Sequence, residues 1–177
     1  MKAAMMKLEL PLEQLAKRRG AAFQFAFATE AKELVPESDG FALAASHKGL
    51  HVLAENEEAL ARPVDVLRDV YGASLELAPP RVRLIEGVQV KEPVMHVRIS
   101  MYADFREPVK SALRRRGATL SEEHVRSTYC VLRHEARLAD LLGFPAELSR
   151  LTAGTGKHWI VLSHYAIVTR DPGGRAA

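Results

Sequence analysis

The stretch VMHVRISM, residues 94–101, decides the fold of the second half of this chain, because apolar and polar side chains alternate along it. Such alternation is typical of a β-strand that buries one face and exposes the other. A helix is expected next, over residues 105–116, with Asp104 as its N-cap and Pro108 tolerated in its first turn. Gly117 then fits the left-handed position that commonly ends a helix.

The rest of the second half predicts two strands, a broken helix and a last strand. Two strands are expected between residues 119 and 137, and a helical pattern covers residues 138–151 with an interruption at residues 143–145. Residues 158–162 are the last expected strand. The order β-α-β-β-α-β is that of the ferredoxin-like fold, an antiparallel sheet with two helices on one face.

The first half is less regular, and its apolar pattern predicts a mixture of helices and strands. The expected elements are a helix over residues 12–19 ending at Gly20, a strand over 23–27, a hairpin of 41–45 with 50–54, a helix over 56–71 ending at Gly72, and a strand over 74–84. Pro79 and Pro80 interrupt the last strand, which indicates an edge or a bulge.

These patterns predict an α+β protein made of two small α/β sandwich modules. The expected division is an irregular module over residues 1–88, a ferredoxin-like module over residues 89–170 and a tail over residues 171–177. Residues 85–93 are the expected linker, because Gly87 and Pro93 punctuate a polar stretch there.

Composition excludes several classes of protein. No apolar run approaches the roughly 20 residues that cross a bilayer, and residues 1–7 do not continue into the apolar core of a signal peptide. The single cysteine, Cys130, has no partner for an internal disulfide. We therefore expect a cytoplasmic protein without a membrane partner.

Charge is distributed unevenly along the chain. Residues 1–89 carry 11 Lys and Arg against 13 Asp and Glu, whereas residues 90–177 carry 14 against 9 and five of the seven histidines. A basic second half favours an anionic partner, and a solvated surface is the simpler alternative. Arg114, Arg115 and Arg116, with Lys110 one turn earlier, are either phosphate contacts or favourable charge at a helix end.

No pattern for catalysis or metal binding stands out. Residues 151–158 lack the first glycine and the final Ser or Thr of a phosphate loop, and they precede a strand instead of opening a helix. The histidines lack the spacing of paired zinc ligands. We expect Cys130 to be a buried, inert thiol and Trp159 to lie in the core rather than serve as a stacking platform. The chain is therefore expected to have no enzymatic activity, cofactor or metal.

Six ordered motifs in the second half resemble the last domain of elongation factor G and related translation GTPases. They are EPVMHV at 92–97, RRRG at 114–117, LADLLGF at 138–144, ELSRLT at 147–152, GTG at 154–156 and SHY at 163–165. Thr155 stands where the family has an arginine. Residues 66–72 and 75–82 are similar, less closely, to the closing helix and strand of the third domain of these factors. The first 50 residues match no segment of the family.

The resemblance implies a non-catalytic module that binds the ribosome, through rRNA or a ribosomal protein near the factor site. It also implies that this chain joins third- and fifth-domain-like parts without the GTPase domain. The residues that would contact RNA or the ribosome are Lys110, Arg114, Arg115, Arg116 and Lys157. The alternative is an adaptor for proteins or ligands, unrelated to translation, which could form a homodimer through exposed sheet edges.

Overall fold

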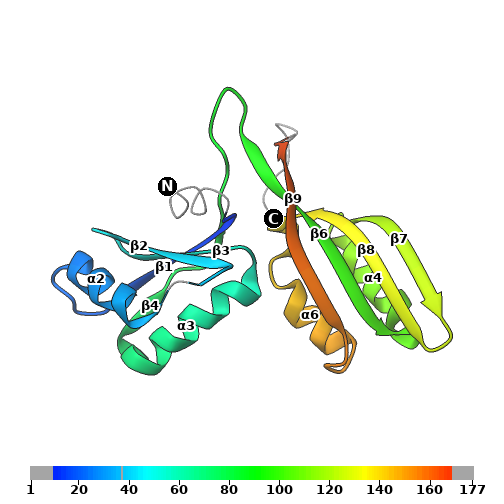
Figure 1. The fold of residues 1–177 in the computed structure, drawn as a ribbon, viewed down its shortest axis with the longest axis horizontal. Helices are drawn as coiled ribbons and strands as arrows, with labels where there is room; N and C mark the ends of the chain where they lie inside the picture. Colours follow the sequence, from blue (N-terminus) through cyan, green and yellow to red (C-terminus); the bar gives the residue numbers. More distant parts are fainter. Residues whose placement is uncertain (1–9, 37, 169–177) are drawn as a thin grey trace.

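A computed structural model of the protein describes residues 10–36 and 38–168, which form two α/β modules (Figure 1). The elements of the first module are β1 (Leu12–Arg18), α2 (Gln24–Leu34), β2 (Phe41–Ser46), β3 (Gly49–Ala54), α3 (Glu57–Tyr71), β4 (Leu75–Leu77) and β5 (Arg81–Val82). Its antiparallel sheet has the strand order β2-β3-β1-β4, and β5 also pairs with β1.

The second module has the arrangement that its sequence predicts. Its elements are β6 (Lys91–Tyr102), α4 (Arg106–Arg115), β7 (Thr119–Arg126), β8 (Tyr129–Arg137), α5 (Leu138–Leu141), α6 (Phe144–Leu151) and β9 (Lys157–Ile167). The antiparallel order β7-β8-β6-β9 is the ferredoxin-like one and confirms the α+β class. The first module repeats this order with its own strands, so it is more regular than its sequence indicates.

The central strand β6 separates a buried face of the second sheet from an open one. Met95, Val97, Ile99 and Met101 are buried, and α4 and α6 lie on one side of the sheet (Figure 1). The alternate residues of β6 face the other side, where no described helix covers the sheet. Trp159 lies on that open side and is 48% exposed, so the expectation that it belongs to the core is wrong.

The expected helix over residues 12–19 is wrong, because these residues form strand β1. Leu12 pairs with Ala54 and Ala16 pairs with Leu50, and all four side chains are buried. Apolar residues four apart suit one face of a strand as well as one face of a helix, so the local pattern does not distinguish them. Gly20 therefore ends no helix; it occupies a turn between β1 and α2, with φ at +74°.

The expected strand over residues 23–27 is also wrong, because helix α2 begins at Gln24. The helix buries Phe27, Ala28 and Ala31, whose spacing places them on one helical face. Phe23 and Phe25 remain exposed, so the alternating phenylalanines do not mark a buried strand face.

The hairpin and the helix that follows it are confirmed. Strands β2 and β3 pair from Phe41 to Ala54, and the Asn56 side chain accepts a hydrogen bond from the Ala59 amide at the start of α3. Gly49 opens β3 with φ at +135°, and a Cβ there would lie 2.3 Å from the Ala16 carbonyl oxygen. This close approach of β1 requires glycine.

Local details of the second module agree with the sequence in part. Asp104 does not cap α4; it lies in a short 3-10 turn, and Phe105 occupies the N-cap position without a side-chain hydrogen bond. The predicted interruption is confirmed, because Gly143 with φ at +78° separates α5 from α6 and Pro145 lies in the first turn of α6.

The segment between the two sheets is shorter than the predicted linker. Ile85 and Lys91 exchange backbone hydrogen bonds, and β6 already includes residues 91–93. The predicted tail over residues 171–177 lies outside the described residues. None of the described helices combines the length and apolarity required to span a membrane.

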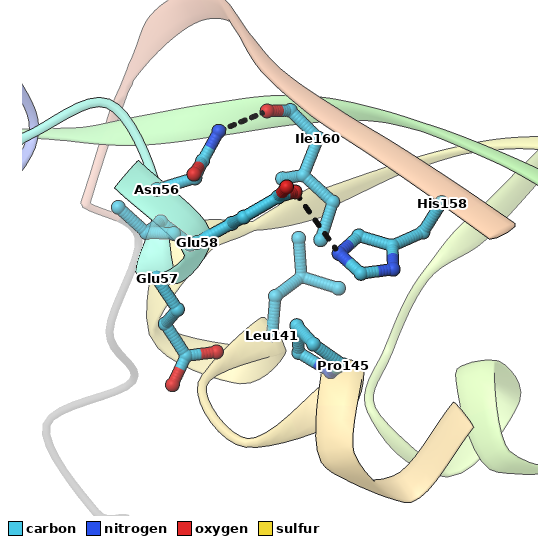
Figure 2. Close-up of a pocket in the computed structure, with 8 residues that line it drawn as sticks. Asn56, Glu57, Glu58, Leu141, Pro145, His158 and Ile160 are labelled. Carbon is cyan, nitrogen blue, oxygen red and sulfur yellow. Dashed lines mark hydrogen bonds and ion pairs between the residues drawn. The ribbon is translucent and has the colours of Figure 1, made fainter. Parts of the chain in front are cut away.

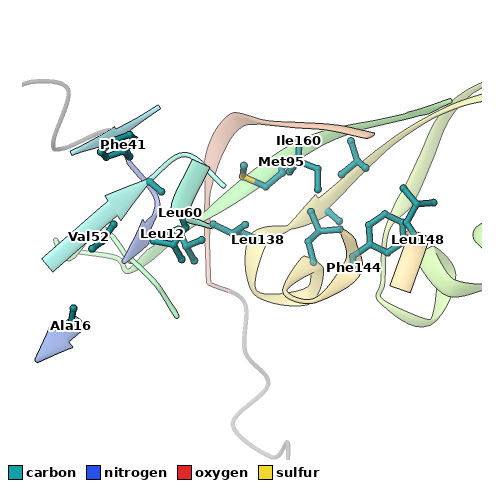
Figure 3. Packing of buried hydrophobic residues seen from close by; sticks show 14 of the residues in the cluster. Leu12, Ala16, Phe41, Val52, Leu60, Met95, Leu138, Phe144, Leu148 and Ile160 are labelled. Carbon is teal, nitrogen blue, oxygen red and sulfur yellow. The ribbon is translucent and has the colours of Figure 1, made fainter. Parts of the chain in front are cut away.

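One continuous hydrophobic core serves both modules (Figure 3). It includes Leu12 and Leu60 from the first module and Met95, Leu138 and Phe144 from the second. The modules are therefore joined through packed side chains as well as through the connecting chain.

A buried histidine lies under helix α4. His134 on β8 is 4% exposed, and its Nδ1 has no hydrogen-bond partner among the described groups. Burial, together with the positive charge of Lys110, lowers the pKa of His134 to about 4, although the Glu123 carboxylate acts in the opposite direction. The imidazole is therefore neutral at pH 7.

This burial predicts acid sensitivity. As the pH falls from about 6.5 toward 4, the unfolded chain takes up a proton at His134 that the folded chain does not, so the free energy of unfolding decreases, by about 3 kcal/mol in all. Urea unfolding at pH 7.5 and 4.5 measures this loss, and His134→Leu should remove most of it. Equal losses in the two proteins would contradict the assignment.

Candidate nucleic-acid interface

Helix α4 and its C-cap residue, Arg116, carry four of the five cations that the sequence selects, and they present them in different directions. The helix buries Val109, Ala112 and Leu113 against the sheet. Consecutive residues of a helix are separated by about 100°, so the adjacent arginines at its end point in different directions. Their contacts within the protein therefore differ.

Arg116 is a structural residue. Its guanidinium donates to Oε2 of Glu147 at 2.8 and 3.0 Å and to the carbonyl oxygens of Asp140 and Leu142 at 2.7 and 3.0 Å. It also lies over the Phe144 ring, 5.7 Å from its centroid. These contacts fasten the end of α4 to the α5–α6 junction, and the hydrogen bonds from Arg116 lower the pKa of Glu147.

Lys110 is also committed within the protein. Its Nζ lies 2.8 Å from Oε2 of Glu123 on β7, and both side chains are largely covered. The hydrogen bond from Lys110 lowers the pKa of Glu123, so the carboxylate is ionised at neutral pH. Little of the Lys110 charge is therefore available to an outside partner.

Two further cations of the predicted set are exposed on α4. The Arg115 side chain is 63% exposed, and its guanidinium lies 3.1 Å from Oε1 of Glu147. The other oxygen of that carboxylate binds Arg116. Arg114 is exposed, and its side chain has no partner among residues 10–36 and 38–168. The end of α4 therefore offers two of its three arginines to a partner.

Lys157 does not join this cluster. It starts β9 opposite Ser100 of β6, and the register places both on the open face of the second sheet, away from α4. The predicted set of five therefore divides into an exposed pair on α4, two internal cations and one lysine on the opposite side of the sheet.

Sequence reasoning missed further exposed cations on that open face. Arg98 lies 5.0 Å from the Trp159 ring centroid, and Arg126 ends β7. The alternation within residues 94–101 is sufficient to find Arg98, because it assigns that residue to the face opposite Met95 and Val97.

The two modules meet at the start of helix α3, where the side chains of three consecutive residues contact the second module. Figure 2 shows two of these contacts, those of Asn56 and Glu58. The Asn56 amide donates to the Ile160 carbonyl oxygen at 3.0 Å, and the Glu57 carboxylate accepts from the Gly143 amide at 2.9 Å. Glu58 lies 3.9 Å from His158. The hollow they line has a volume of about 10 Å³, enough for about one water molecule, so it is a joint and not a ligand pocket.

Known proteins resemble this chain chiefly through its second module. Residues 89–175, just under half of the chain, match the family described as elongation factor G C-terminus. Elongation factor G 2 of Hahella chejuensis (strain KCTC 2396) is 32% identical over 100 residues, which are 56% of this chain and 13% of that protein. The resemblance that the sequence motifs indicate is thus confirmed, and the second module is translation-factor-like.

A solved structure shares the fold of both modules. It is a crystal structure of a Thermus thermophilus protein, matched with a TM-score of 0.64 over 89% of this chain and 40% of that chain, at 14% identity. Coverage of 89% requires both modules, and at this identity the likeness concerns the fold alone. The chain thus spans 13% of its curated relative and 40% of this solved chain.

The contacts of Arg116 predict that it stabilises the fold, unlike its neighbour. Arg116→Ala should lower the free energy of unfolding by about 2–3 kcal/mol, because two carbonyl groups and a largely covered carboxylate lose their donor. Arg114→Ala should change it by less than about 0.5 kcal/mol. Urea unfolding of both variants tests this. Equal losses of stability would contradict the assignment of a structural role to Arg116 and not to Arg114.

Asn56 is predicted to join the modules as well as cap α3. Asn56→Ala should lower the free energy of unfolding by about 1–2 kcal/mol, since it removes both hydrogen bonds. Asn56→Ser retains a capping oxygen and removes the donor to Ile160, so it should recover about half of this loss. Chemical denaturation of both variants measures the difference, and a serine variant as stable as the original would show that the bridge contributes nothing.

Proposed function

We propose that this chain is a non-catalytic, elongation-factor-G-like module that binds the ribosome in the cytoplasm. The match of residues 89–175 to the elongation factor G C-terminus is the observation that carries the proposal. The partner would be rRNA or a ribosomal protein near the site where translation factors bind. The first module, in which residues 66–72 and 75–82 resemble the third domain of these factors less closely, would help to position the second.

The exposed end of α4 supplies the chemistry that this proposal needs. Arg114 and Arg115 face solvent at the end of a helix whose orientation is fixed by Arg116. Two exposed guanidinium groups on a fixed helix end can contact phosphate oxygens and release their counterions. Such contacts position a protein on RNA without reading its sequence.

The loop before β9 differs from a nucleotide-binding loop. The amides of Gly154, Thr155 and Gly156 donate to oxygens of Ser149 and Thr152 within the same turn. These amides are therefore not directed together at a phosphate, as they would be in a nucleotide-binding loop. No group of three or more metal-ligating side chains gathers within the described parts of the chain.

Sedimentation with purified bacterial ribosomes across a salt series tests the proposal. The chain should co-sediment, and doubling the salt concentration should lower its affinity about three- to sixfold if two or three phosphates are neutralised. The double variant Arg114→Ala, Arg115→Ala should bind about tenfold more weakly, because both exposed guanidinium groups of α4 are removed.

A charge-matched control removes two exposed arginines of the first module, Arg62→Ala with Arg68→Ala, and should retain ribosome binding. Absence of salt-sensitive co-sedimentation, or equal loss in both double variants, would refute ribosome binding through α4. Concentration-dependent self-association without ribosome binding would instead favour the adaptor.

A further inference from the structure

The open face of the second sheet combines exposed aromatic rings with cations. We define this open face by six residues that point away from the helices: Arg98, Tyr102, Arg126, Tyr129, Arg133 and Trp159. The strand register arranges them in rows across the sheet. Trp159, Arg98 and Arg133 form one row, and Tyr102, Tyr129 and Arg126 form another.

The aromatic rings on this face are exposed to solvent. Trp159 is 48% exposed, Tyr102 49% and Tyr129 39%. The two tyrosine rings lie edge to face with centroids 5.5 Å apart, and the Arg98 guanidinium lies over the Trp159 ring. Rings held in this way at a surface present flat apolar platforms to solvent.

The free charge of the open face is positive. Arg133 is paired with Glu122 at 3.0 Å, and His96 lies 3.3 Å from Glu135. Arg98 and Arg126 have no carboxylate partner in the described ranges 10–36 and 38–168. The carboxylates of Glu122 and Glu135 are thus paired with cations of the same face. The guanidinium groups of Arg98 and Arg126, which lie beside the aromatic rings, are left as its excess positive charge.

The surface between these side chains is hollowed. One hollow of about 530 Å³ is lined by His96, Arg98 and Trp159, and another of about 300 Å³ by Arg98, Arg126 and Tyr129. Arg98 lines both, so the hollows adjoin. The two aromatic rows are four residues apart along β6, which corresponds to about 13 Å.

We propose that the open face binds a segment of unpaired RNA. Two or three bases would stack on Trp159 and on the Tyr102–Tyr129 pair, while Arg98 and Arg126 hold the intervening phosphates. Four-stranded sheets bind single-stranded RNA by such stacking, because every base has a flat π face. An acidic protein would use the cations but gain little from the rings.

This inference does not rest on the proposed ribosome contact of α4. Helix α4 covers the opposite side of the same sheet (Figure 1), so the two surfaces can be changed separately. Arg114→Ala with Arg115→Ala should leave the quenching of Trp159 fluorescence by a short RNA intact, because the stacking takes place on the other side of the sheet. Failure of one proposal is therefore distinguishable from failure of the other.

The test uses the full chain and a fluorescein-labelled, mixed-sequence RNA of eight nucleotides. Trp159 is the only tryptophan, so quenching of the intrinsic fluorescence on RNA addition reports stacking directly. Anisotropy of the labelled RNA gives affinities, which should fall as salt rises. Trp159→Ala and Tyr102→Ala with Tyr129→Ala should each weaken binding about tenfold or more.

Matched variants separate stacking from folding. Trp159→Phe keeps a ring and should recover most of the affinity, and Arg98→Ala should weaken binding while circular dichroism shows an unchanged fold. Unquenched tryptophan, unchanged affinity in the alanine variants, or equal binding of duplex RNA would overturn the proposal. Equal binding of DNA of the same sequence would overturn the assignment to RNA, and a dimer that dissociates in Trp159→Ala would assign the face to a second copy.

Discussion

Every second side chain of β6 is removed from water, and the arrangement of the second module depends on this constraint. Met95, Val97, Ile99 and Met101 are at most 1% exposed. Burying each side chain contributes about 1.5–3 kcal/mol, so a one-residue slip that exposed all four would cost on the order of 6–12 kcal/mol. This is comparable with the whole stability of a small domain. The register of β6 against β8 and β9 is therefore fixed, and the helices must pack on the apolar face.

The same constraint explains which parts of the fold the sequence could predict. Alternation in residues 94–101 and the glycines at helix ends are local signals, and they locate most of the second module. Residues 12–18 lack such a signal, because Leu12 and Ala16 fit either periodicity. Their strand conformation is determined by pairing with β3, about 40 residues later, which local periodicity does not reveal.

The errors at the functional surfaces have a related origin. The aromatic bulk of Trp159 favours the core, although its position between Ile160 and His158 gives it the other face of β9. Arg114, Arg115 and Arg116 look equivalent in sequence, yet Arg116 alone reaches carbonyl groups of the α5–α6 junction. Charge and hydrophobicity indicate what a side chain can do, whereas direction determines what it contacts.

The cations of the second module fall into two groups, those that are paired inside the protein and those that are exposed. Arg116 and Lys110 stabilise the module through Glu147 and Glu123, and their positive charge is largely offset there. Arg114, Arg98 and Arg126 have no such carboxylate among the described residues. The net charge of the second half therefore overstates what each surface offers, and the two sides of one sheet present different chemistry.

The hydrogen bond from Asn56 to the Ile160 carbonyl has a consequence for biosynthesis. Strand β9 is long, lies at the end of its sheet and is the last described strand to leave the ribosome, so until it is covered its free carbonyl groups can pair with another nascent chain. The first module is translated earlier and can already be folded when β9 emerges. The start of α3 is thus in place to cover part of that edge, so the joint between the modules also protects the end strand of the second sheet.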